Sequence, residues 1–330
     1  MSTHSKNKTL LFFFFFFLHK LPSGFGALQV GFYGSSCPKA ESIIQQVVHR
    51  RISDDRSLAA SLLRLQFHDC FVHGCDASLL IGTGNEHGLK KPEKGAFDSL
   101  FLRGFEVIDE IKESLEAECP STVSCADIIA LVARDAVGVA GGPKYEVLTG
   151  RRDGLVSNAG DVKLPQPDFS TKQALDSFIS VGLTSSDMVT LLGAHTLGVA
   201  HCGFIDPRLE PSSDGNQSSD HPPMDPLLKA KLAKYCSEDE NRRVFMDLGS
   251  PFVFDNSFYK QLLLRRGILE LDERLAFDNS TRVLVSRYAA DNGAFLRGFA
   301  RAMVKMGSIQ VLVGEEGEIR KNCGAFNNPE

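Results

Sequence analysis

Residues 64–75 read Arg64-Leu65-Gln66-Phe67-His68-Asp69-Cys70-Phe71-Val72-His73-Gly74-Cys75, which joins a helical apolar pattern to a group of chemically reactive side chains. Arg64, Phe67 and His68 are spaced i, i+3 and i+4, so on a helix they share one face. An imidazole can carry a proton in both directions near neutral pH, and a guanidinium stabilises negative charge on oxygen. Taken alone, such a pattern is more often a core histidine beside a surface arginine.

Helical spacing of apolar residues extends in both directions from this stretch. Ser124 with Asp127, and Thr184 with Asp187, resemble capping boxes before apolar runs, and Gly193 follows the second run as a stop signal. Sustained alternation of apolar and polar residues is scarce, so we predict an all-α fold. The other ranges with helical spacing are 40–52, 59–70, 105–118, 172–181, 226–235, 256–265 and 282–306, the last interrupted near Asn292-Gly293.

Length and charge limit the class of protein. The chain has 330 residues, 43% of them hydrophobic, which is enough for two domain-sized lobes. No linker is long enough to separate independent domains, so we expect two lobes in one compact unit. The formal net charge of −5 argues against a nucleic-acid-binding protein, which usually carries a basic excess.

The N-terminus has the pattern of a secretory signal peptide. The apolar run from Leu10 to Leu18 contains six consecutive phenylalanines and is too short to span a bilayer. We predict a signal peptide over residues 1–26, cleaved near Gly26 or Ala27, and a single domain over 27–330. No later stretch of about 18 apolar residues indicates a membrane anchor. Removing three lysines with the signal leaves 33 basic against 41 acidic residues, a net charge of −8.

All eight cysteines follow the predicted cleavage site. An even number of cysteines in a secreted chain indicates four disulfides, although eight cysteines allow 105 pairings. A zinc site formed by His68, Cys70, His73 and Cys75 is the alternative. We favour disulfides because the chain has the signature of a secreted protein.

Two further kinds of candidate site stand out. His195, in Gly193-Ala194-His195-Thr196, follows an apolar helix and is a candidate metal ligand whose second ring nitrogen would bind a carboxylate. Oxygen-bearing residues that suit a hard cation gather in two short segments. These are Asp69, Asp76 and Ser78 around Gly74, and Asp247, Ser250 and Asp255.

Several of these motifs together resemble the plant secretory (class III) haem peroxidases. The resemblance runs from about Gln29 to Cys323, which is nearly all of the predicted mature chain. The stretches that carry it are Phe67 to Ser78 (FHDCFVHGCDAS), Arg103 to Asp109 (RGFEVID), Val123 to Asp127 (VSCAD), Gly150 to Asp153 (GRRD) and Gly193 to Gly198 (GAHTLG).

The resemblance implies a two-lobed haem peroxidase fold with one haem b between a distal and a proximal lobe. His195 matches the axial ligand of the haem iron, and Asp272 matches the carboxylate partner of that histidine. Arg64 and His68 match the distal catalytic pair, beside the aromatic wall of Phe67.

The resemblance also implies two Ca²⁺ sites, a donor site and a disulfide pattern. Pro165 matches the proline beside the aromatic donor site. One calcium site would use Asp69, Asp76 and Ser78, the backbone carbonyls of Val72 and Gly74, and Glu93 through water. The other calcium site would use Thr196, Asp247, Ser250, Val253 and Asp255. The implied disulfides are Cys37–Cys119, Cys70–Cys75, Cys125–Cys323 and Cys202–Cys236.

The implied activity is reduction of hydrogen peroxide to water with oxidation of small phenols in one-electron steps, by a secreted monomer.

Three positions depart from the family pattern. Ser99 replaces an asparagine that holds the distal histidine, Met246 replaces a phenylalanine near the proximal histidine, and Tyr145 replaces a tryptophan. The first two favour the alternative of a catalytically weak haem- and calcium-binding wall protein. Asn216 and Asn279 begin N-glycosylation sequons.

Overall fold

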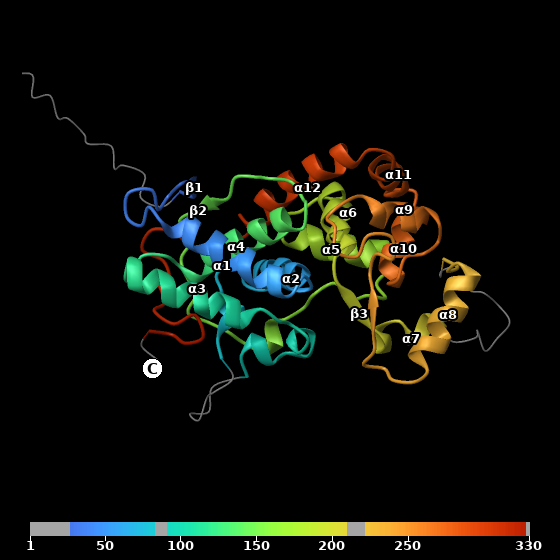
Figure 1. Cartoon of the computed structure of the whole chain (residues 1–330), viewed down its shortest axis with the longest axis horizontal. Coiled ribbons are helices and arrows are strands. Elements are labelled where there is room, and N and C mark those ends of the chain that lie inside the picture. Colours follow the sequence, from blue (N-terminus) through green and yellow to red (C-terminus); the bar gives the residue numbers. More distant parts are fainter. Residues whose placement is uncertain (1–26, 83–90, 210–221, 328–330) are drawn as a thin grey trace, which may run out of the picture.

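The computed structural model of the chain describes residues 27–82, 91–209 and 222–327. The predicted signal peptide, its cleavage site and the Asn216 sequon lie outside the described residues. Within them the chain is mainly helical, as predicted, with short helices and strands between the longer helices (Figure 1).

Four long helices form one half of the molecule. They are α1 (Ala40–Asp54), α2 (Leu58–Cys70), α3 (Phe105–Glu118) and α4 (Cys125–Val139). α4 packs against α1, α2 and α3, because nearly all of its apolar residues are buried. α1, α2 and α3 match the predicted ranges within two residues, and α4 begins directly after its predicted cap, Ser124.

The second half carries the remaining helices (Figure 1). They are α5 (Thr171–Ser180), α6 (Ser185–Leu192), α7 (Asp206–Leu209), α8 (Pro226–Cys236), α9 (Ser257–Leu263), α10 (Glu270–Phe277), α11 (Arg282–Ala290) and α12 (Asn292–Met306). The predicted range 282–306 is divided at Asp291, whose side chain accepts from the Ala294 backbone amide and caps α12. The short helix α10 was not anticipated.

Short elements complete the described chain. Two antiparallel pairs join β1 (Gln29–Val30) to β2 (Leu148–Thr149) and β3 (Val199–His201) to β4 (Arg243–Phe245). The 3₁₀ helices are η1 (Ser78–Leu80), η2 (Glu93–Gly95), η3 (Phe97–Ser99), η4 (Ala159–Asp161), η5 (Gly193–Thr196) and η6 (Cys202–Phe204).

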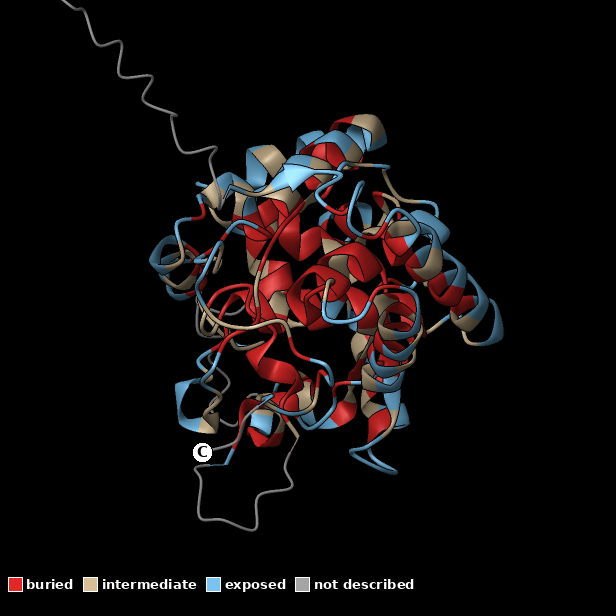
Figure 2. Ribbon diagram, turned by 90° about the vertical axis from the view of Figure 1, so that its left-hand side faces the viewer, coloured by how far each residue is buried: buried red, intermediate tan, exposed pale blue. Residues whose placement is uncertain are grey.

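One large hydrophobic core runs through both halves, and a smaller one lies around β3, α7 and α8. Figure 2 shows the buried residues concentrated on the inner helices, with exposed residues on the outside. The larger core includes buried residues from both halves. Within the described residues, no single helix is long and apolar enough to cross a membrane; α5 with the segment Ser185–Thr196 meets that test only as a pair bent by 107°.

The capping predictions were correct at one helix and half correct at the other. Thr184 and Asp187 form both hydrogen bonds of a capping box at α6. At α4, Ser124 accepts from the Asp127 backbone amide, but the Asp127 carboxylate is used elsewhere. It accepts from Tyr33 and Gly150 and forms a buried ion pair with Arg151.

Candidate active site

A cavity of about 520 Å³ lies where the two halves meet, and its walls bring the predicted catalytic residues together. Arg64, Phe67 and His68 line it from α2, and His195 lines it from η5. Its volume is in the range of cofactor sites in proteins. The helix face predicted from the i, i+3, i+4 spacing therefore borders the same space as the predicted metal ligand.

The distal side holds a hydrogen-bonded pair. The Nε of Arg64 donates to the Nε2 of His68 at 2.9 Å, one helical turn apart on α2. Burial, together with the positive charge of Arg64, lowers the pKa of His68 well below its ordinary value. His68 is therefore neutral at pH 7, with its proton on Nδ1 and a lone pair on Nε2, which suits it to accept a proton.

Ser99 does not hold the distal histidine. Among the described residues, the Nδ1 of His68 and the Oγ of Ser99 are both buried without a hydrogen-bond partner. Buried polar atoms normally have partners, so the His68 ring is oriented only by packing and by the hydrogen bond from Arg64. Phe67 supplies part of that packing, with its ring centroid 5.6 Å from that of His68.

The proximal side is built around His195. Its Nδ1 donates to both carboxylate oxygens of Asp272, at 2.9 and 3.0 Å, and Asp272 is buried on α10. Since Nδ1 is engaged in this way, Nε2 is the nitrogen left to bind a metal. The ring of Phe258 on α9 lies 6.1 Å from His195 at nearly a right angle, a contact that the sequence did not indicate.

Gly193 permits this arrangement at the end of α6. A Cβ atom at this position would lie 2.6 Å from the ring of Phe295 and closer still to the hydroxyl of Tyr259. Only glycine therefore allows η5 to pack so closely on α9 and α12. Met246 also lines the cavity, where the family pattern has a phenylalanine.

The first oxygen cluster lies directly behind His68. Asp69, Asp76, Ser78 and Glu93 are all buried. Neither carboxylate oxygen of Asp69 or of Glu93 has a hydrogen-bond partner among the described residues. Burial and the neighbouring carboxylates raise the pKa of Asp69 well above its ordinary value, and burial above all raises the pKa of Glu93 to about 8. Carboxylates in this state are stabilised by a cation.

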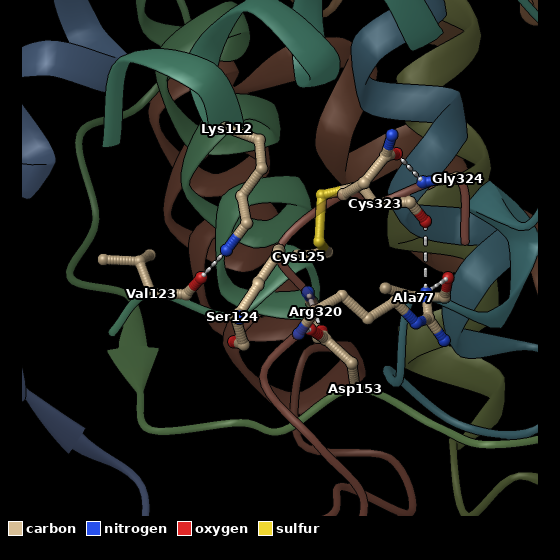
Figure 3. The surroundings of a disulfide bond; sticks show 12 residues. Ala77, Lys112, Val123, Ser124, Cys125, Asp153, Arg320, Cys323 and Gly324 are labelled. Atoms are coloured by element: carbon tan, nitrogen blue, oxygen red, sulfur yellow. Dashed lines mark hydrogen bonds between the residues drawn. A yellow bond between two sulfur atoms is a disulfide. The ribbon is translucent and has the colours of Figure 1, made fainter. Parts of the chain in front are cut away.

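The C-terminal segment supports this cluster. Arg320 is fully buried and donates to the backbone carbonyls of Ala77 and Gly154, at 2.7 and 2.6 Å. Figure 3 shows its guanidinium reaching Ala77 beside the disulfide between Cys125 and Cys323. The loop that carries the first oxygen cluster is thus fixed from the other end of the chain.

The second oxygen cluster lies directly behind His195. The Oγ1 of Thr196 donates to Asp247 at 3.1 Å and is 3.5 Å from the Val253 carbonyl. The Oγ of Ser250 donates to Asp247 at 3.3 Å and to Asp255 at 3.0 Å. All five residues predicted for this cluster therefore come together, although they span 60 positions of the chain.

The cysteine prediction is confirmed, and the zinc alternative is wrong. Cys70 and Cys75 are bonded to each other, so their sulfurs are not available as zinc ligands. The other pairs are Cys37–Cys119, Cys125–Cys323 and Cys202–Cys236, the pattern that the resemblance implied.

Comparison with known proteins shows the family of this chain. The family model of the peroxidases matches residues 44–291. Peroxidase 44 of Arabidopsis thaliana is 47% identical over 321 residues, covering 97% of this chain and 99% of its own length. Peroxidase 57 of the same plant is 49% identical over 306 residues, covering 93% and 95%. The chain therefore belongs to the plant secretory (class III) haem peroxidases, enzymes that reduce hydrogen peroxide with electrons from a reducing donor.

Proposed function

We propose that this protein is a secreted, monomeric peroxidase in which one haem b lies between His68 and His195 and small phenols are the donors. The observation that carries the proposal is the single cavity bordered by the Arg64–His68 pair on one side and by the Asp272-bound His195 on the other. Residues 27–330 form its one domain, and residues 1–26 direct secretion.

The lining of the cavity suits haem b. The free Nε2 of His195 would bind the haem iron. The porphyrin would rest on apolar side chains, among them Phe178 and Met246. Haem b carries two carboxylates, and the cationic groups of Arg56 and Arg243 also line the cavity.

The protein side chains supply proton transfer and charge stabilisation. Bound haem supplies the redox chemistry. The neutral Nε2 of His68 accepts a proton from one oxygen of the peroxide and delivers it to the other, which leaves as water. Arg64 stabilises the negative charge on the departing oxygen. Two phenols, each losing one electron and one proton, complete the reduction of hydrogen peroxide to two molecules of water.

Asp272 keeps His195 in the correct orientation and tautomer. Its carboxylate accepts from Nδ1, which gives the imidazole more anionic character and makes Nε2 a stronger donor to iron. Asp272 is buried, so water does not compete for this hydrogen bond.

The donor site would lie at the mouth of the cavity beside Pro165. The side chains of Phe97 and Leu100 are largely exposed, on the segment that borders this mouth. An aromatic ring can pack on such apolar surface while its phenolic hydroxyl points into the cavity.

The decisive experiment is a spectrum of the haem-loaded protein, followed by a guaiacol assay with peroxide. An active peroxidase shows a Soret band that changes on adding peroxide and returns as the phenol is consumed. The alternative, a catalytically weak haem-binding wall protein, rests on Ser99 and Met246. It would show the Soret band with negligible turnover.

We also propose Ca²⁺ at both oxygen clusters. The first would use Asp69, Asp76, Ser78, Glu93 and the carbonyls of Val72 and Gly74. The second would use Thr196, Asp247, Ser250, Val253 and Asp255. Asp69 directly follows His68 and Thr196 directly follows His195, so each ion would fix the end of a catalytic helix.

Removal of calcium should lower the melting temperature by about 5 °C or more. An ion present at 100 times its dissociation constant contributes about 2.7 kcal/mol, and a domain of this size gains about 2 °C per kcal/mol. Calorimetry before and after chelation, with the metal content measured in parallel, checks this. In Asp69→Asn, the fall in melting temperature on chelation should be smaller than in the parent. In Asp54→Asn, on the exposed end of α1, this fall should be the same as in the parent. Complete calcium release without a change in melting temperature would contradict the proposal.

Ser99→Asn should speed the reaction with peroxide about fivefold. The longer amide would accept a hydrogen bond from Nδ1 of His68, and one such bond contributes about 1 kcal/mol. Stopped-flow measurement of the second-order rate constant checks this. Ser99→Ala is the matched control and should stay within twofold of the parent, because the serine hydroxyl makes no hydrogen bond to His68. Equal rates for the parent and the asparagine variant would refute the argument.

One modification site follows from the predicted secretion. Asn279 is exposed in the loop between α10 and α11, at the start of the sequon Asn279-Ser280-Thr281. We propose that it carries an N-linked glycan in the secreted protein.

A further inference from the structure

The cavity has a carboxylate at its mouth that the reaction described above does not use. Asp98 lies on η3 and is half-buried. Among the described residues that line the cavity, it is the only one with an acidic side chain. It adjoins Ser99 in the chain but projects into the cavity, whereas Ser99 is buried behind it.

The charge of Asp98 is not neutralised by a direct partner. Within the described part of the chain, Asp98 forms no ion pair; its nearest polar contact is the amide of Gln166, whose Nε2 lies 3.4 and 3.5 Å from the two oxygens. Arg103, which also lines the cavity, is held by Asp55 at 2.7 Å. The carboxylate therefore remains available to a molecule that enters the cavity.

The negative charge of Asp98 also affects the pKa of Arg64, at longer range than a direct contact. Burial lowers the pKa of the Arg64 guanidinium, and the negative charge of Asp98 opposes that shift. Arg64 is directed to His68 through its Nε, so it does not neutralise Asp98 by contact. The cavity thus has one negative side chain, Asp98, near the buried Arg64, and its other lining arginines are Arg56, Arg103 and Arg243.

Apolar surface surrounds the carboxylate. Phe97 and Leu100, in the same segment, are 67% and 59% exposed. Pro165 also lines the cavity, next to Gln166. A flat aromatic ring with a positive or hydrogen-bonding substituent complements this surface, whereas a ring that carries a carboxylate would face like charge.

We propose that Asp98 selects the reducing donor by charge, favouring cationic and neutral phenols over anionic ones. This inference rests on the proposed use of phenolic donors at the cavity mouth. It adds no chemical step: each phenol still gives up one electron and its phenolic proton. Asp98 acts only by attracting or repelling the side chain of the donor.

The effect can be measured with three phenols that differ in one group. Tyramine is cationic, tyrosol is neutral and 4-hydroxyphenylacetate is anionic at pH 7, while the phenol ring is the same in all three. A single charge a few ångströms from a partly exposed carboxylate changes affinity about threefold to tenfold. We expect kcat/KM to fall in the order tyramine, tyrosol, 4-hydroxyphenylacetate.

Asp98→Asn removes the charge and keeps the shape. In the haem-loaded enzyme it should lower the ratio of kcat/KM for tyramine to that for 4-hydroxyphenylacetate about tenfold, with tyrosol changed less than twofold. The ratio cancels any effect on the peroxide step, which is common to all three donors. Dissociation constants of tyramine and 4-hydroxyphenylacetate, measured by calorimetry without peroxide, should shift in the same directions.

A matched control separates local charge from net charge. Glu113→Gln changes the total charge equally on the exposed face of α3, away from the cavity, and should leave the ratio unchanged. An unaltered ratio in Asp98→Asn would overturn the inference, as would an equal change in Glu113→Gln. If none of the three phenols is oxidised by the parent enzyme, the proposed phenolic donors are wrong, which is a distinct failure.

Discussion

Replacing His68 by leucine should lower the second-order rate constant for hydrogen peroxide by about 10²- to 10⁴-fold, which is the usual contribution of a positioned acid–base group. Leucine fills a similar volume but cannot move a proton. His68 is buried and neutral, and the Nε of Arg64 contacts its Nε2, so no neighbouring group among the described residues is placed to replace it. Stopped-flow mixing of the haem-loaded protein with peroxide measures the effect.

The control for this experiment is the same substitution on the surface. His49 is exposed on α1, and His49→Leu should react with peroxide at the parent rate. The Soret band of His68→Leu should keep its intensity, because His195 still binds the iron in this proposal. A loss of less than tenfold would show that His68 is not the acid–base group.

Replacing His195 by alanine should weaken haem binding at least about 100-fold, since removing even an outer partner of a metal ligand costs 10- to 100-fold. The Nδ1 of His195 is fixed by Asp272, so Nε2 is the only coordinating atom that this residue can offer. The measurement is the ratio of haem to protein after gel filtration. Full haem retention in this variant would exclude His195 as the ligand.

Asp272→Asn provides the graded comparison. The amide keeps the shape of the carboxylate but carries no charge, so haem should be retained more weakly than in the parent and more strongly than in His195→Ala. Equal retention by Asp272→Asn and the parent would show that the contact between Asp272 and His195 does not contribute to haem binding.

Local patterns in the sequence predicted most of the helices because the apolar residues that define a helix lie within a few turns of one another. In α1, Ile44, Val47 and Val48 recur at helical spacing and are all buried. α10 escaped prediction because it is only eight residues long and opens with the charged residues Glu270, Asp272 and Glu273. Its buried Asp272 binds His195, which is 77 positions away in the chain, and local periodicity does not reveal such a contact.

The capping prediction at α4 was only half correct because long-range contacts also decide where the Asp127 side chain lies. Ser124 caps the helix as its local sequence predicts, since the contact spans three residues. The Asp127 side chain instead binds Arg151 and Tyr33, which are distant in the chain. Where a buried ion pair is available, a charged side chain gains more from it than from a reciprocal cap.

The amino-acid sequence alone was sufficient for the helical class, for the shared face of Arg64 and His68, and, through its resemblance to known peroxidases, for the pairing of the cysteines. Only the tertiary structure showed that Asp98 faces the cavity while Ser99 beside it does not, and that Phe258 lies against His195. The reason is physical. Spacing along a helix determines which neighbouring residues share a face. Contacts between distant segments depend instead on how the whole core packs.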